Sequence, residues 1–168
     1  GASILISVPL AYLTVRTNLP GRRFWTVAVM LPLVIPSYIG AFAFVSAFGP
    51  QGEVQSLLAP LGVESLPGIY GLWGTVLVLT LYTYPYVFVT ARAALKTLDT
   101  RLIDAARTLR HDRKGAFRRV VVPHLRPAVA AGGLLSALYV LSDLGTPEFM
   151  RFQVFATVIY SASTYSLE

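Results

Sequence analysis

The sequence contains no cysteine, and this absence excludes a disulfide framework, a cysteine-ligated zinc site and thiol catalysis. Charged residues are also scarce: they make up 13% of the 168 residues, whereas a typical soluble domain has about 25%. The phosphate-binding pattern G-x-x-x-x-G-K-[ST] and the nucleophile motif G-x-S-x-G are both missing. We therefore predict that this chain is not an enzyme and holds no cofactor.

Histidine is rare as well, and its two copies are His111 and His124. They are 13 positions apart in a basic segment, and no carboxylate-rich set of partners accompanies them. We predict no metal site at these residues and a solvated or phosphate-side role for both.

Apolar residues, by contrast, make up 55% of the chain and form long runs without Asp, Glu, Lys or Arg. Residues 24–52 give 29 such positions, 65–91 give 27 and 127–142 give 16. A helix that spans a bilayer needs about 20 mostly apolar residues. The sequence therefore predicts an all-α, polytopic membrane protein, a single transmembrane domain over 1–168 with spans at about 1–15, 24–48, 69–92 and 127–143. We expect the first span to be cut at its N-terminal end, in an excerpt of a longer protein, and a short external helix at about 153–166.

The basic residues are concentrated between the predicted spans. Segment 92–126 has ten basic and three acidic residues, and segment 16–23 has three basic residues and no acid. Segment 50–68 has two acids, Glu53 and Glu64, and no base. Because short loops rich in Lys and Arg stay on the cytoplasmic side, we predict that Arg16–Arg23 and Lys96–Pro123 are cytoplasmic. We predict that Gln51–Glu64 and the N-terminus are external. A solvated loop held by anionic lipid remains an alternative for 92–126, whereas nucleic-acid binding is disfavoured because no recognised basic motif is present.

The cytoplasmic segment 97–124 has the pattern of two short amphipathic helices joined by a turn. Asp112 is a good N-cap for the second helix, and Pro123 is expected to end its regular pattern. Such a pair on one side of a membrane predicts a docking element for a partner protein. A helix pair lying on the membrane surface is the alternative, because it would use the same basic and apolar faces.

One spacing within this segment resembles the coupling loop of binding-protein-dependent ABC importer permeases. The family pattern is Glu-Ala-Ala, three residues, Gly, nine residues and Ile-x-Leu-Pro. The chain has Asp104-Ala105-Ala106, then Arg110 at the glycine position, then Val120, Val122 and Pro123. Other stretches, among them SYIGAFAF, TYPYVF and SDLGTPEF, are most similar to the N-terminal half of ferric-iron transport permeases.

The resemblance implies a permease subunit that moves substrate across the bacterial inner membrane by alternating access. Its implied partners are cytoplasmic ABC ATPase subunits, a periplasmic substrate-binding protein, a second permease half or subunit, and membrane lipid. Asp104 would be the ion-pairing anchor for the ATPase. The other coupling residues that the resemblance implies are Ala105, Ala106, Leu109, Arg110, Ala116, Phe117, Val120 and Pro123.

The resemblance favours ferric iron as substrate, with a permease for thiamine, putrescine or a sulfate-type substrate as the alternative. A channel that works without ATP, or a membrane scaffold, is the alternative of a different class. Asp143, the one acid at the end of a span, and Tyr139 are candidates for the translocation pathway. Asp143 could equally be a helix-end or turn residue, and tyrosines near spans also form interfacial belts.

Overall fold

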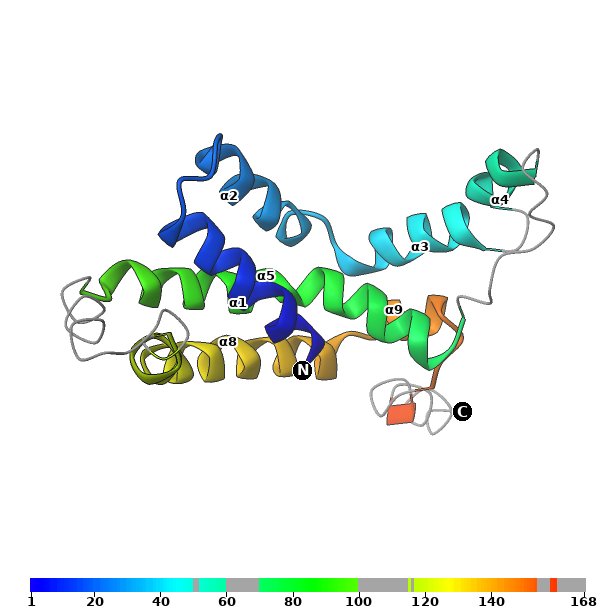
Figure 1. Cartoon of the computed structure of the whole chain (residues 1–168). Coiled ribbons are helices and arrows are strands. Elements are labelled where there is room, and N and C mark those ends of the chain that lie inside the picture. Colours follow the sequence, from blue (N-terminus) through cyan, green and yellow to red (C-terminus); the bar gives the residue numbers. More distant parts are fainter. Residues whose placement is uncertain (50–51, 60–69, 100–114, 116, 154–157, 160–168) are drawn as a thin grey trace. The chain divides into compact units, whose positions relative to one another are not determined.

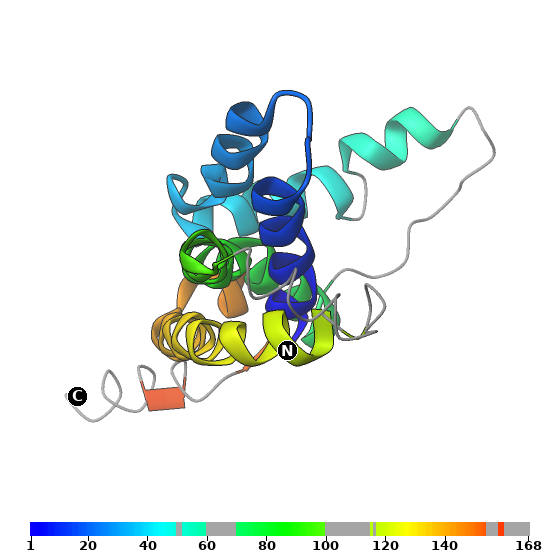
Figure 2. The ribbon, with the colours of Figure 1, turned by 60° about the vertical axis from the view of Figure 1, so that its left-hand side comes forward.

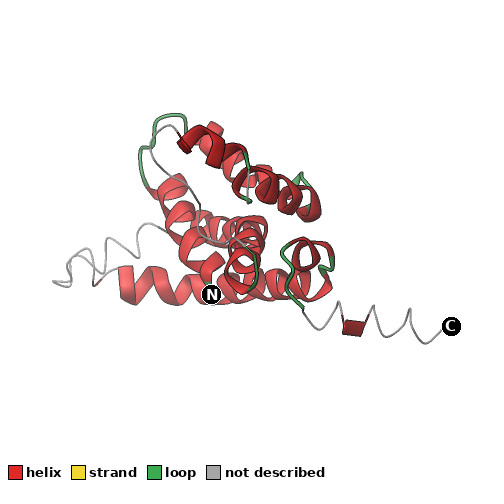
Figure 3. Ribbon diagram, turned by 90° about the vertical axis from the view of Figure 1, so that its right-hand side faces the viewer, coloured by secondary structure: helices red, strands yellow, loops and turns green. Residues whose placement is uncertain are grey.

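The computed structural model describes the chain except for residues 50–51, 60–69, 100–114, 116, 154–157 and 160–168. Within the described part, helices and loops account for all residues, and no strand occurs (Figure 1, Figure 3). In chain order the helices are α1 (Ala2–Arg16), α2 (Arg22–Met30), the 3-10 turn η1 (Leu31–Leu33), α3 (Ser37–Phe48), α4 (Glu53–Leu58), α5 (Leu72–Thr97), the π-helical turn η3 (Phe117–Val121), α8 (Val122–Ser142) and α9 (Gly145–Phe149). The predicted all-α class is confirmed.

Two helices are long and apolar enough to cross a membrane by themselves. They are Leu72–Thr97 and Phe117–Ser142, each of 26 residues. At about 1.5 Å of rise per residue each is roughly 39 Å long, compared with about 30 Å for the hydrocarbon core of a bilayer. Helix α1 is apolar but has only 15 residues. The length and composition of these helices support a multi-pass membrane protein.

The apolar run predicted as one span at 24–48 is divided in the structure. Helix α2 and turn η1 end at Leu33, and α3 begins at Ser37, directly after Pro36. Proline has no backbone N–H and disfavours helical conformation in the residue before it, so Pro36 explains why the helix does not continue. Neither Arg22–Leu33 nor α3 is long enough to cross a membrane by itself.

The fourth span also differs from its prediction. It was expected at 127–143, but the helix begins ten residues earlier, at Phe117. Pro123 does not end a helix: it is the second residue of α8 and follows the π-helical turn η3. A change of helix pitch here is understandable, because a proline removes one donor and its ring crowds the carbonyl four residues earlier. The predicted external helix at about 153–166 lies almost entirely outside the described residues.

The chain divides into two compact units, which are described separately. The first unit comprises Gly1–Leu31 and Thr83–Ala137, and the second comprises Pro32–Tyr82 and Leu138–Glu168. Helices α5 and α8 each contribute one part to each unit.

In the first unit, α1, α2, α5 and α8 lie side by side (Figure 1, Figure 2). Its buried apolar core is built around α5, from Phe88, Ala91, Leu95 and Leu98 together with Ala11, Val29, Val121 and Leu125. Gly132 of α8 makes the closest approach: a Cβ there would lie 2.7 Å from the Val87 Cα of α5. Small residues at such contacts allow membrane helices to pack with their backbones close together.

The second unit has a smaller described core, formed by Ala41, Val78 and Met150. Gly40 of α3 lies against the ring of Tyr82, which occupies the space that a Cβ would need. The Gly71 N–H donates to the Met150 carbonyl over 2.7 Å and joins the start of α5 to the end of α9. Phe42 and Phe149 make an edge-to-face contact with ring centroids 6.1 Å apart.

Candidate functional site

Side-chain hydrogen bonds to backbone carbonyls show that α1 and α5 run in the same direction in the first unit. Near the start of α1, the Ser7 hydroxyl donates to the Tyr84 carbonyl over 2.5 Å. At the end of α1, the Arg16 guanidinium donates to the Leu95 carbonyl over 2.9 Å. Since residue numbers rise together along both helices, α1 and α5 end at the same end of the unit.

Helix α8 runs in the opposite direction to α5. His124, near its start, has its ring Nε2 2.9 Å from the Ala94 carbonyl, to which it donates. Ser136, further along, donates to the Thr83 carbonyl over 3.1 Å. The start of α8 therefore lies beside the end of α5, and the partly exposed His124 is bonded to the backbone of α5.

Helix α2 is also antiparallel to α5. The Tyr84 hydroxyl donates to the Val29 carbonyl near the end of α2 over 2.9 Å. Arg22, at the start of α2, lines the same cavity as Lys96 near the end of α5. The basic residues of four helices thus meet at one end of the first unit, which we call the basic end; it includes Arg16, Arg22, Arg23, Arg92, Lys96, Arg118 and Arg119.

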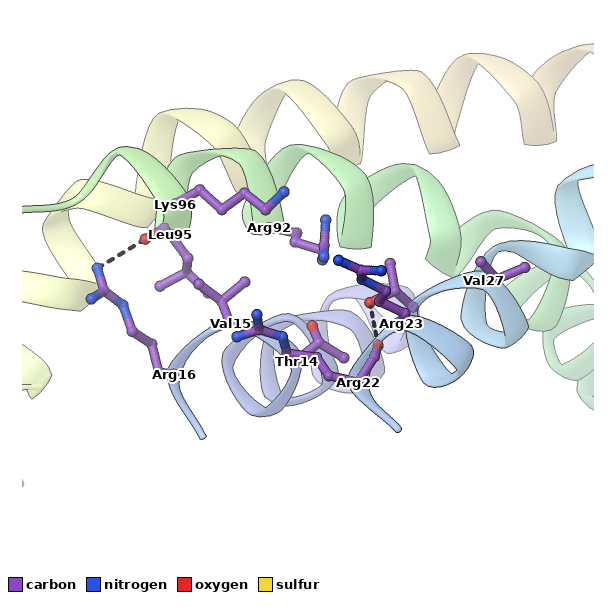
Figure 4. Close-up of a pocket in the computed structure, with 10 residues that line it drawn as sticks. Thr14, Val15, Arg16, Arg22, Arg23, Val27, Arg92, Leu95 and Lys96 are labelled. Atoms are coloured by element: carbon purple, nitrogen blue, oxygen red, sulfur yellow. Dashed lines mark hydrogen bonds between the residues drawn. The ribbon is translucent and has the colours of Figure 1, made fainter. Parts of the chain in front are cut away.

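A cavity of about 630 Å³ opens at the basic end between α1, α2 and α5 (Figure 4). Five cationic side chains line it, and none of the lining residues that the structure describes is acidic; the cationic residues are Arg16, Arg22, Arg23, Arg92 and Lys96. Thr14, Val15, Thr26 and Val27 supply the wall on α1 and α2. Such a cavity is suited to an anion.

Two of these arginines are partly buried. Arg16 donates to the Leu95 carbonyl and, over 2.7 Å, to the Leu98 carbonyl, so it satisfies the last turn of α5. The Nε atoms of Arg16 and Arg92 are both buried and have no hydrogen-bond partner among the described residues. Figure 4 shows Arg16 turned toward Leu95, while Arg23 and Arg92 point into the space between α2 and α5.

The predicted coupling residues fall into two groups. Asp104, Ala105, Ala106, Leu109, Arg110 and Ala116 lie outside the described residues, so their predicted roles stay predictions. Phe117 and Val120 are described, and both are partly buried against the core of the first unit. The Phe117 ring meets the Tyr12 ring edge to face, with centroids 5.3 Å apart. Pro123 is exposed on the first turn of α8.

The pathway candidates Asp143 and Tyr139 belong to the second unit. One carboxylate oxygen of Asp143 accepts from the Thr146 hydroxyl over 2.8 Å, and the other accepts from the Thr146 N–H over 3.2 Å. Asp143 therefore stabilises the turn between α8 and α9, the structural role that its sequence context also allowed. Tyr139 is partly buried, and its carbonyl accepts from the Asp143 N–H over 3.0 Å.

Comparison with known proteins identifies the family. The sequence profile described as "binding-protein-dependent transport system inner membrane component" matches residues 3–167. A probable molybdenum ABC transporter permease protein of Haloferax volcanii is 34% identical over 150 residues, which cover 89% of this chain and 53% of that protein. An Fe(3+)-transport system permease protein of Haemophilus influenzae is 29% identical over 89% of this chain and 26% of that protein.

A sulfate transport system permease protein of Salmonella typhimurium is 28% identical over 84% of this chain and 50% of that protein. The chain thus spans about half the length, or less, of these curated relatives. The match over 3–167, the all-α structure and the two long apolar helices agree with one another. This chain belongs to the family of binding-protein-dependent transport system inner membrane components.

Proposed function

We propose that the chain is the membrane-spanning part of an importer subunit that works by alternating access in a bacterial inner membrane. Separate cytoplasmic ABC ATPase subunits would supply the energy, and a periplasmic binding protein would deliver the substrate. The observation that carries this proposal is the convergence of basic helix ends at the end of α5, the helix that precedes the Asp-Ala-Ala spacing in the sequence. Because Lys- and Arg-rich ends stay inside, the basic end would face the cytoplasm and the ATPase.

The packing of the first unit suggests how movement would be transmitted. The segment with the Asp-Ala-Ala spacing begins after α5 and leads into η3 and α8, so both of its ends belong to the first unit. The hydrogen bonds from His124 to Ala94 and from Ser136 to Thr83 hold α5 and α8 together. A push on the segment would therefore move these helices as one body, and ATP would act through its different affinity for two conformations.

The coupling proposal is tested with Asp104→Ala in the full-length transporter. We expect the variant to copurify with less ATPase subunit and to lose ATP-driven uptake, because the acid would no longer pair with the ATPase. Asp112→Asn is the matched control, since it removes an acid from the same segment outside the Asp-Ala-Ala spacing. Phe117→Ala is less suitable, because this ring packs on Tyr12 and its loss would disturb the unit itself.

Equal ATPase copurification and uptake in Asp104→Ala and Asp112→Asn would contradict the coupling role. A channel is distinguished by the dependence on ATP: it would pass substrate into vesicles without nucleotide. The importer we propose would not do so.

We propose ferric iron as the first candidate substrate, on the likeness of SYIGAFAF, TYPYVF and SDLGTPEF to iron permeases. The charge of the second unit favours a cationic substrate. Its described charged residues are three acids, Glu53, Asp143 and Glu148, and one base, Arg151. An oxyanion is the second candidate, because two of the relatives are described as molybdenum and sulfate permeases.

Uptake of labelled ferric iron, molybdate and sulfate by cells that express the whole transporter decides between the two candidates. We expect accumulation of iron alone. Uptake of molybdate or sulfate without iron would replace the first candidate by the second, and uptake of labelled thiamine or putrescine would exclude both.

A further inference from the structure

Among the described residues, the cavity at the basic end holds cations without acids to balance them. Its five cationic side chains come from α1, α2 and α5, and none of the described residues that line it is acidic. Like charges held close together repel one another, and an anion bound among them would relieve that repulsion. A second observation points the same way: the buried Nε atoms of Arg16 and Arg92 have no hydrogen-bond partner among the described residues.

The start of α2 increases the positive potential of the cavity. Arg22 and Arg23 occupy the first turn of this nine-residue helix, where the helix dipole is positive and basic residues are unfavourable. The N-cap residue is Gly21, which makes no side-chain hydrogen bond to the first turn. The first backbone N–H groups of α2 are therefore available to an anion together with the two guanidinium groups.

The surface beside the cavity indicates which anion fits. Directly after the arginine pair, Phe24 is 68% exposed and Trp25 is 49% exposed, and the two rings contact edge to face. Aromatic side chains at helix ends mark the interface between membrane and water. Val27, which lines the cavity, is 60% exposed, and Leu31 one turn further on is 54% exposed. An apolar track thus leads from the cationic cavity along α2.

We propose that this cavity binds the phosphate headgroup of an anionic phospholipid. Arg22, Arg23, Arg92 and Lys96 hold the phosphate, and an acyl chain lies along Val27 and Leu31. Arg16 shapes the cavity through its bonds to α5 and leaves the remaining cations to the lipid. A free oxyanion would use the same cations, but it would leave the apolar track uncovered and would fill only a small part of about 630 Å³.

The inference rests on the proposed function only in placing the basic end at the cytoplasmic interface, where anionic headgroups attract basic residues. Its test uses the detergent-purified full-length transporter, titrated with phosphatidylglycerol or phosphatidylcholine and observed by native mass spectrometry. The test variant is Arg23→Gln with Arg92→Gln, and the matched control is Arg118→Gln with Arg126→Gln. Both double variants remove two positive charges. Arg118 and Arg126 are exposed and are not among the residues that line the cavity, so the control tests the effect of lost charge elsewhere on the protein.

We expect phosphatidylglycerol to bind in preference to phosphatidylcholine. The cavity variant should weaken phosphatidylglycerol binding by about tenfold or more, and the control by less than about twofold. The charge-preserving variant Arg23→Lys with Arg92→Lys should keep most of the binding, which separates loss of charge from loss of folding.

Equal weakening in the two double variants, or no preference for the anionic lipid, would overturn the proposal. Inorganic phosphate and molybdate are titrated in parallel. If either one binds the lipid-free protein and displaces phosphatidylglycerol at millimolar concentration, the site is a free-anion site and the lipid assignment is wrong. Because lipid binding in detergent needs neither ATP nor substrate, its failure leaves the transport proposal untouched, and a failure of uptake leaves the lipid site untouched.

Discussion

The two units differ in charge and in what holds their helices together. Thirteen of the 14 Lys and Arg residues fall within the first unit, whereas five of the eight acids fall within the second. Helices in the first unit are joined by side chains that bond to the backbone of a neighbouring helix, as Ser7, Arg16 and Ser136 do. Contacts in the described part of the second unit are mainly aromatic and apolar, as between Phe42 and Phe149.

This difference shows how helix packing can be more stable in one part of a membrane protein than in another. Lipid offers little hydrophobic driving force between helices, so close packing and interhelical hydrogen bonds carry the stability. The first unit has both, at Gly132 and at the carbonyl-bonded side chains. We therefore expect substitutions of these groups to cost more than substitutions of comparable groups in the second unit.

The highest cost of a single substitution is expected at an arginine of the first unit, which we compare with an arginine of the second. Arg16→Met removes two charge-assisted bonds to α5 and should destabilise the protein by about 2–3 kcal/mol. Arg151→Met removes a cation–π contact with Tyr70, 4.9 Å from the ring centroid, and should cost about 0.5–1 kcal/mol. Thermal melting of the two purified variants in the same detergent measures both effects. Equal shifts would show that the first unit is not the firmer one.

A second comparison uses two adjacent glycines of α8. Gly132→Ala places a methyl group against the backbone of α5 and should destabilise by about 1–3 kcal/mol. Gly133→Ala is the control, since its methyl group would meet only Ile4 at 3.9 Å, and it should be neutral or slightly stabilising because alanine favours helices. The same melting experiment applies. If Gly132→Ala were neutral as well, α5 and α8 would not be packed closely at this point.

The third comparison concerns two variants of Asp143 in the second unit, and its expected difference is the smallest of the three. Asp143→Ala removes both bonds to Thr146 and should lower stability by about 1 kcal/mol, whereas Asp143→Asn keeps an acceptor for the turn and should cost less. Uptake by the two variants separates the turn role from a pathway role. If only the turn matters, Asp143→Asn transports normally; lost uptake in this stable variant would return Asp143 to the pathway.

The all-helical class of the fold could be predicted from composition, but the exact ends of its helices could not. The uncharged runs predicted the all-α class, the family pattern was carried by short motifs, and α5 lies where the span 69–92 was predicted. The local prediction at Pro123 was wrong: this proline lies near the start of a continuous helix and does not end one, because η3 adjusts the pitch before it.

The cavity at the basic end could not be predicted, because its cations come from segments up to about 80 residues apart along the chain. Hydropathy and charge rules place such residues on one side of a membrane but do not say which of them meet. Phe117 shows the same limit: its spacing suited a docking face, and only the fold shows that its ring packs on Tyr12. An arginine that directly follows an apolar run, as Arg16 does, is the one local signal that could have indicated a clamp on a neighbouring helix end.

The length of α5 has a consequence for the membrane in which the protein works. A helix of 26 residues exceeds the hydrocarbon thickness by about 9 Å, so it must tilt or extend into the headgroups. Helix α8 with η3 has the same length and is bonded to α5, so the two must tilt together. A change in bilayer thickness would then change the tilt of both helices together. We therefore expect transport rates to depend on the acyl-chain length of the surrounding bilayer.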